Sequence, residues 1–107
     1  DEIVTFFPEL RVIGLHMGLP WLEEYMALIS THPNLFMTTS GYPTDQWEPN
    51  FIEFVNTVGQ DQIIFGSAAP TVTGGIKDTL SGIASHNLNE VANRKVLYEN
   101  AVNLFKL

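Results

Sequence analysis

Three short apolar runs constrain the fold of this chain more than any other feature of its sequence. They occupy residues 11–16, 35–40 and 62–67, and each is nearly continuous rather than alternating. Such runs are typical of strands that are buried on both faces of a parallel sheet. The gaps between them are too long for hairpins but long enough for a crossover helix. Because such connections are right-handed, we expect three neighbouring parallel strands whose carboxyl ends meet at one edge.

Helical patterns fill the gaps between these strands. Apolar residues recur at helical spacing within residues 22–29 and 51–58, and a shorter helix, weakened by Gly82, is expected within 76–84. A last helix is expected to begin within residues 87–90, which have capping-box spacing with Asn in place of Ser or Thr. The order of elements predicts an α/β fold of about three βα units.

A sheet of three parallel strands has two unpaired edges, which favour pairing with further chain. The chain also begins at Asp1 without an initiator Met or a signal pattern. We therefore expect residues 1–107 to form a single partial domain. Its expected macromolecular partner is either a missing N-terminal part of the fold or a second copy of the chain.

The acidic composition narrows the classes of partner further. The chain has 12 acidic and 5 basic residues, a net charge of −7, and no Cys. A surface of this sign repels phosphate backbones and anionic lipid, so we expect neither nucleic acid nor membrane partners. The absence of Cys excludes disulfides, thiolate metal sites and cysteine nucleophiles, and it fits a cytoplasmic protein. No apolar run reaches the roughly 18 residues needed to cross a bilayer.

His16 is the strongest single candidate for chemistry. It lies at the predicted carboxyl end of the first strand, where a turn exposes it at the sheet edge. A neutral imidazole there can act as a general base or as a metal ligand. The alternative, which is commoner for such a position, is a partly buried His satisfied by a backbone carbonyl. His32 and His86 are expected to be structural, because each lies near a helix end.

Polar and aromatic residues that follow the strands are candidates for substrate binding. Trp21 follows the first strand, Ser40 and Tyr42 follow the second, and Ser67 follows the third. A Ser nucleophile needs a nearby base, and the segment around Ser67 lacks the second Gly of a nucleophile elbow. Trp21 and Trp47 either line a pocket or, more commonly, pack against helices.

Metal and anion motifs are sparse. Neither His-x-His nor His-Glu-x-x-His occurs, so the spacing of the three His residues indicates no metal site. Gly74 and Gly75 open a predicted helix and could bind an anion there. A lone Gly pair is more often only a flexible turn.

Several segments resemble the amidohydrolase-2 family. The resembling segments, in order along the chain, are residues 7–18, 19–24, 32–41, 62–67 and 96–105. That family comprises metal-dependent hydrolases and decarboxylases, including the aminocarboxymuconate-semialdehyde decarboxylases and the resorcylate decarboxylases. The resemblance covers essentially the whole chain. It implies a (β/α)8 TIM barrel of which this chain is the C-terminal part, supplying strands six, seven and eight.

The resemblance also implies roles for two positions. His16 corresponds to the family's strand-six His, which lies at the metal and acts in proton transfer or as a ligand. Ala68 stands where the family has an Asp that binds the metal or activates the attacking water. A methyl group can do neither. We therefore expect no catalytic metal in this chain as it stands, and a divalent metal, Zn or Mn, only in the full-length parent.

Two hypotheses about function follow from these features. In the first, the chain is part of an enzyme that hydrolyses or non-oxidatively decarboxylates a small carboxylated or lactone-like molecule. His16 is then the acid/base group, Ser40, Tyr42 and Trp21 bind the substrate, and the chain alone is inactive. In the second, the metal site has been lost, and the chain is a non-catalytic binding or assembly module.

Overall fold

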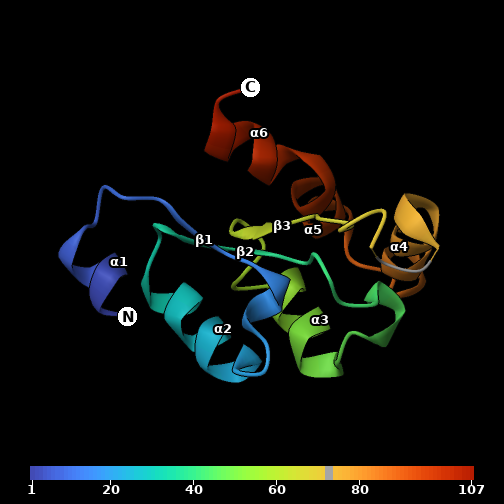
Figure 1. Ribbon diagram of the computed structural model, residues 1–107, viewed down its shortest axis with the longest axis horizontal. Helices are drawn as coiled ribbons and strands as arrows, with labels where there is room; N and C mark the ends of the chain where they lie inside the picture. Colours follow the sequence, from blue (N-terminus) through green and yellow to red (C-terminus); the bar gives the residue numbers. More distant parts are fainter. Residues whose placement is uncertain (72–73) are drawn as a thin grey trace.

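The computed structural model describes residues 1–71 and 74–107, and at its centre lies a parallel sheet (Figure 1). The strands are β1 (Val12–Gly14), β2 (Leu35–Thr38) and β3 (Ile63–Ile64), in the spatial order β1-β2-β3. Both pairs are parallel, with Ile13 opposite Phe36 in the first pair and Thr38 opposite Ile64 in the second. The prediction of three parallel neighbours is confirmed.

The strands are shorter than the apolar runs that predicted them. β1 stops before His16, because His16 has a φ of 55° and has left the extended conformation. Burial on both faces, the other expectation, holds for β3 but not for β1, whose three residues are only half-buried. The continuous apolar run was therefore a correct sign of a strand and an incorrect sign of complete burial.

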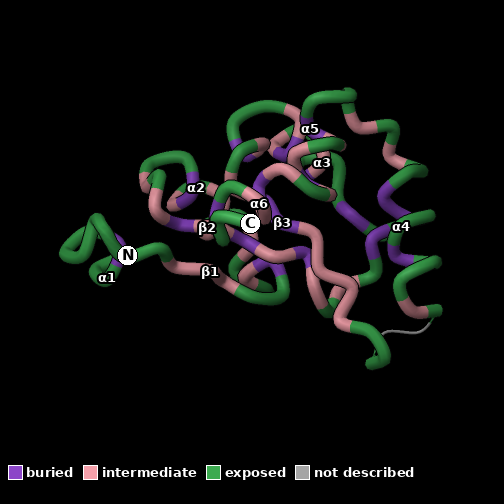
Figure 2. The backbone as a smooth tube through the Cα atoms, turned by 90° about the horizontal axis from the view of Figure 1, so that it is seen from above, coloured by how far each residue is buried: buried purple, intermediate pink, exposed green. Residues whose placement is uncertain are grey.

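Helices flank the sheet on both sides. Helices α2 (Leu22–Thr31) and α3 (Pro49–Asn56) lie on one side of it, and α6 (Asn100–Phe105) lies on the other (Figure 1). In Figure 2 the purple buried segments lie mostly near the centre of the molecule, around β2 and β3 and in parts of the surrounding helices. The largest fully buried side chains include Phe51, Met17, Ile29, Met37 and Ile63. The loops that leave β1 and β2 are thus anchored on a packed core.

The third predicted helix is longer than the expected range of residues 76–84, and its buried face differs from the apolar pattern that predicted it. Helix α4 spans Gly75–Ser85, 11 residues, and its buried residues are Thr79, Gly82 and Ile83. A Cβ atom on Gly82 would lie 2.7 Å from the backbone nitrogen of Asp45. Gly82 therefore allows close packing against the 3-10 turn η2 (Thr44–Gln46) rather than simply weakening the helix.

The C-terminal helical segment begins two residues later than its capping-box spacing indicated. Helix α5 (Glu90–Arg94) starts after Asn89, whose side chain accepts a hydrogen bond from the Ala92 nitrogen at 2.8 Å. Asn87 is not the cap, and its φ is 51°. A π turn, η3 (Lys95–Glu99), joins α5 to α6.

This C-terminal segment covers the outer edge of β3. Asn100 donates through its amide to Ile63 O at 2.8 Å and to Gln60 O at 2.7 Å. The Phe65 nitrogen donates to Val96 O, in η3, at 2.9 Å. The expectation of two open edges is therefore wrong for β3. Among the described strands, none pairs with the outer edge of β1.

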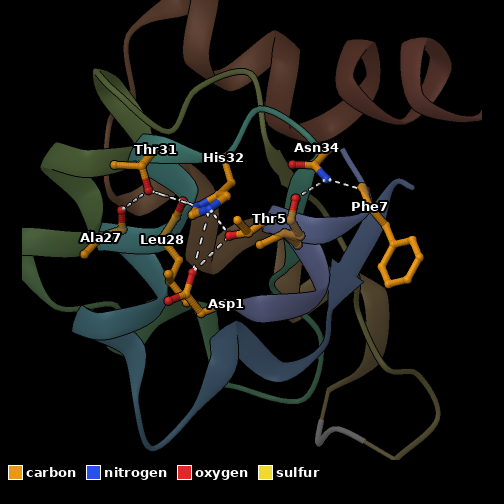
Figure 3. Close-up of polar contacts among 9 residues, drawn as sticks. Asp1, Thr5, Phe7, Ala27, Leu28, Thr31, His32 and Asn34 are labelled. Atoms are coloured by element: carbon orange, nitrogen blue, oxygen red, sulfur yellow. Dashed lines mark hydrogen bonds and ion pairs between the residues drawn. The ribbon is translucent and has the colours of Figure 1, made fainter. Parts of the chain in front are cut away.

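A short helix that the sequence did not predict, α1 (Glu2–Phe6), lies at one end of the molecule (Figures 1 and 2). Figure 3 shows how it is attached. His32 Nε2 lies 3.1 Å from the Thr5 hydroxyl, and the Asn34 amide donates to Val4 O and Phe7 O at 3.1 and 3.2 Å. These contacts agree with a structural role for His32. Within the described ranges, no helix is long and apolar enough to span a membrane.

Candidate active site at the carboxyl edge of the sheet

The carboxyl ends of β1 and β2 are joined through His16. Its Nδ1 atom lies 2.9 Å from the carbonyl oxygen of Ser40, which follows β2. Gly41 lies directly against the ring, and a Cβ atom there would be only 2.9 Å from His16 Cε1. The end of β3 is adjacent, because a Cβ atom on Gly66 would lie 3.0 Å from Ser40 Cβ. The three strand ends therefore meet at one edge, as their spacing in the sequence predicted.

The Ser40 contact determines which nitrogen of His16 is available for chemistry. A carbonyl oxygen only accepts hydrogen bonds, so Nδ1 must carry the proton and donate a hydrogen bond to Ser40 O. In the neutral ring Nε2 then keeps its lone pair. The His16 side chain is exposed at this edge. The arrangement supplies a base or a ligand atom on the face where α/β barrels bind their substrates. It also contains the backbone-carbonyl contact of the alternative interpretation, so the two descriptions of His16 are compatible.

The backbone around His16 is unusual. His16, Met17 and Gly18 form a short turn, η1, with φ values of 55°, 57° and 69°. The left-handed conformation costs a non-Gly residue roughly 1–2 kcal/mol. Met17 is 1% exposed, so its burial offsets part of this cost. Strained backbone of this kind persists where the surroundings fix it, which is common at functional sites.

The other candidate residues lie in different environments. The Ser40 hydroxyl is 2.9 Å from the Thr38 hydroxyl, and Tyr42 is half-buried against the core. Trp21 is 64% exposed, so the expectation that it packs in the core or against a helix is wrong. Trp47, by contrast, is 4% exposed. Its ring stacks on His86 with the centroids 5.5 Å apart, in agreement with a structural role for His86.

Neither serine at the edge has the partners of a nucleophile. The Ser67 hydroxyl accepts a hydrogen bond from the Ala69 nitrogen at 3.2 Å. The hydrogen bonds of the described residues join neither Ser67 nor the Ser40 hydroxyl to an imidazole. Because activation of a serine requires an adjacent base, the described contacts do not favour a serine nucleophile at this edge.

The start of α4 does not resemble an anion site. Gly74, with a φ of 80°, precedes the helix, and a Cβ atom there would collide with the Asp78 carboxylate. A negative charge therefore already lies at this helix start and disfavours a second anion. A cleft of about 530 Å³ lies nearby between η2 and α4, lined by Thr44, Asp45 and Asp78 among others. It does not include His16.

The residues of this chain do not fit a complete metal site. Across residues 1–71 and 74–107, no group of three or more His, Cys, Asp and Glu side chains lies together in a way that could hold a metal ion. His16 offers one ligand atom, and Ala68, beyond the end of β3, offers none. A catalytic zinc site uses three protein ligands, so a metal would need ligands from outside this set.

A family model described as "Amidohydrolase" matches residues 1–107. The chain belongs to the amidohydrolase family. No curated protein matches it. A solved structure, an uncharacterized TIM-barrel protein from Bordetella bronchiseptica, is 25% identical with a TM-score of 0.85.

The extent of the structural match explains the open sheet. The match covers 99% of this chain and 37% of the Bordetella bronchiseptica protein, so the chain spans well under half the length of that relative. Three parallel strand–helix units thus have the fold of part of a TIM barrel. The predicted fold class and family are confirmed.

Two residues at the edge were missed by inspection of the sequence. Gly41 gives the His16 ring its room, and Tyr25 packs beneath the same turn. Tyr25 belongs to the apolar stripe that predicted α2, where an aromatic residue indicates only core packing. In the sequence, the contact between Gly41 and His16 was indicated only by a Gly that directly follows the Ser at the end of a predicted strand.

Proposed function

We propose that this chain forms the last three βα units of a longer amidohydrolase-family barrel whose substrate is a small carboxylated or lactone-like molecule. His16 is the general acid/base group of the reaction, and Ser40, Tyr42 and Trp21 contact the substrate. The observation that carries the proposal is the hydrogen bond from His16 Nδ1 to Ser40 O at 2.9 Å. This contact supports the proposal because it leaves Nε2 as the proton-accepting atom of a residue at the edge where barrel enzymes work.

The imidazole can serve either of the two reactions considered. In hydrolysis, Nε2 accepts a proton from the attacking water, which bonds to the acyl carbon, and returns that proton to the leaving oxygen. In decarboxylation, the carbon–carboxylate bond breaks to release CO2, and protonated His16 supplies the proton that replaces the carboxyl group. Ser40 O accepts the hydrogen bond from Nδ1–H throughout and holds the ring in place. Hydrolysis returns the imidazole to its neutral starting state as the carbon–oxygen bond to the leaving group breaks, whereas after decarboxylation a proton from solvent restores the protonated ring.

The experiment that tests this proposal is the substitution His16→Gln in the complete polypeptide. The amide keeps much of the size and hydrogen-bonding capacity of the ring but does not titrate near neutrality. We expect hydrolysis of a lactone panel, or CO2 release from a panel of carboxylated aromatic compounds, to fall by about 100-fold or more. The matched control is His32→Gln at the opposite end of β2, which should leave the rate unchanged. Full activity of His16→Gln would remove His16 from the mechanism.

A second candidate function rests on position 68. The Ala68 side chain has no atom that could bind a metal, its φ is 54°, and its backbone oxygen accepts a hydrogen bond from the Thr71 nitrogen at 2.9 Å. A chain in which His16 is the single ligand among the described residues at this edge could act as a non-catalytic binding or assembly module. The zinc and manganese content of the complete polypeptide separates the two candidates. About one equivalent per chain, with activity lost on chelation, favours the enzyme, whereas a metal-free protein that turns over neither panel favours the module.

A further inference from the structure

The turn that carries His16 needs support from outside itself. Two consecutive non-Gly residues, His16 and Met17, have left-handed backbone angles. Their combined cost is a few kcal/mol on the usual scale for such residues. Two backbone hydrogen bonds close the turn, from the Gly18 nitrogen to Leu15 O and from the Leu19 nitrogen to His16 O, both 3.1 Å. These bonds define the turn but do not fix its position over the sheet.

Tyr25, on α2, occupies the space beneath this turn. A Cβ atom on Gly18 would lie 2.8 Å from Tyr25 Cγ, and a Cβ atom on Gly14 would collide with the phenol hydroxyl. Gly14 ends β1 and Gly18 ends η1, so the ring packs against the backbone on both sides of His16. The two glycines allow this close approach, because any larger residue at either position would displace the ring.

The Tyr25 hydroxyl also reaches the neighbouring strand. It donates to Phe36 O, in β2, at 2.9 Å. Tyr25 thereby joins β2 to the turn after β1, the same two parts of the chain that the His16–Ser40 hydrogen bond joins. Burial raises the pKa of Tyr25 above 10.0, against a smaller opposing effect of the Gly14 backbone. The hydroxyl therefore stays protonated, and able to donate, throughout the neutral range.

We propose that Tyr25 is a positioning residue that holds His16 in the Nδ1-protonated form with Nε2 directed outward. This inference rests on the proposed function, because it concerns the group assigned there as acid/base. Tyr25 does not touch the substrate. It keeps the His16 turn and the Ser40 carbonyl at a fixed separation, so that the hydrogen bond between them persists. Loss of that constraint leaves the ring free to adopt the other tautomer and other rotamers.

The test combines two substitutions of graded severity with a matched control. Tyr25→Phe removes the hydrogen bond to Phe36 and keeps the ring against the two glycines, whereas Tyr25→Leu removes both. Tyr98→Phe is the control, because Tyr98 is 64% exposed in η3. Nitrogen-15 NMR of the imidazole rings, recorded at a pH where they are neutral, reports which nitrogen of His16 carries the proton. Circular dichroism confirms folding of each variant.

We expect the Nδ1-protonated form to dominate in the unmodified protein and in Tyr98→Phe. Its share should fall in Tyr25→Phe, and fall further in Tyr25→Leu. In the complete polypeptide, kcat should fall by about 10-fold and about 100-fold respectively, as for other small misplacements of catalytic groups. An unchanged tautomer in folded Tyr25→Phe, or an equal change in Tyr98→Phe, would overturn the inference. If Tyr25→Leu does not fold, Tyr25→Phe alone decides.

The two measurements test the positioning role of Tyr25 and the catalytic role of His16 separately. If His16→Gln retains full activity, the proposed function fails, whatever the Tyr25 variants show. If the Tyr25 variants leave the tautomer unchanged while His16→Gln is inactive, the function stands and the positioning role fails. A residue that only stabilised the fold would lower the melting temperature without altering the proton distribution on His16.

Discussion

Gly41 leaves room for the His16 imidazole where any other residue would compete with it. Its φ is 79°, and a Cβ atom built on it would lie 2.9 Å from Cε1 of the ring and closer still to Nδ1. The neighbouring Ser40 carbonyl is the acceptor that fixes the ring. The hydrogen bond between His16 and Ser40 therefore depends on the absence of a side chain at position 41.

We predict that Gly41→Ala breaks the contact between His16 and Ser40. The new methyl group must displace the ring, because the three atoms nearest to its position all belong to the His16 side chain. We expect loss of the protected Nδ1–H signal in NMR spectra, and destabilisation of about 1–2 kcal/mol from the left-handed backbone.

The matched control is Gly75→Ala. Gly75 also has a positive φ, 63°, but a Cβ atom there meets nothing within 4 Å. That variant should show a similar loss of stability in denaturant unfolding with an unchanged His16 signal. If the His16 signal survives in Gly41→Ala, the ring does not depend on the space at position 41.

Some of the edge could be predicted residue by residue and some could not. His16 and Ser40 were identified because both follow apolar runs of strand length, and parallel strands bring their ends together. The exposure of Trp21 was missed, because its packing depends on where the turn after β1 places it. Tyr25 was recognised only as a helix-stripe residue. Its contacts arise because Gly14 and Gly18 leave room for its ring, and neither glycine belongs to the apolar stripe that predicted α2.

At the scale of elements, the periodic helices were predicted and the irregular ones were not. Helices α2 and α3 have clear apolar stripes, which give the 3.6-residue period. Helix α1 has five residues and one buried side chain, Val4, too few for any period to appear. The π turn in η3 is similarly invisible to periodicity. Its position is explained by the hydrogen bond that Val96 O accepts from the Phe65 nitrogen at the edge of β3.

Asn34 explains how so short a helix as α1 is retained. Its side-chain amide donates to three carbonyl oxygens, those of Val4, Phe7 and Leu10, at 3.0 to 3.2 Å. Two of these contacts hold α1 and its end, the one to Phe7 being drawn in Figure 3, and the third holds the segment leading into β1. One residue directly before β2 therefore contacts the N-terminal segment at three points.

We predict that Asn34→Ala releases α1 while the sheet stays folded. Three backbone oxygens lose the amide that donates to them, which should lower the free energy of unfolding by about 1–3 kcal/mol. Hydrogen exchange should accelerate within residues 2–10 and remain slow in β2 and β3. The control is Asn103→Ala on α6, because Asn103 is exposed. Equal exchange in residues 2–10 of both variants would show that Asn34 does not hold this segment.

In the molecule as a whole, the two outer edges of the sheet differ in how far other parts of the chain cover them. The Asn100 amide and the Val96 carbonyl cover β3. No described strand covers the outer edge of β1, and Leu15, directly after it, is 60% exposed. Because a strand with free backbone groups favours pairing, we propose that β1 pairs with the remainder of the barrel in the complete polypeptide. In isolated residues 1–107, a second copy would take that place.

We therefore predict that isolated residues 1–107 associate through β1, and that a charge at this edge prevents it. Leu15→Lys places an ammonium group beside the open strand, where it opposes edge-to-edge pairing. Val58→Lys is the matched control, because Val58 is 59% exposed and lies beyond the end of α3. Light scattering over a range of concentrations should show dimers or larger species for the unmodified chain and for Val58→Lys, and monomers for Leu15→Lys. A chain that stays monomeric without substitution, with β1 protected from hydrogen exchange, would show that the edge needs no partner.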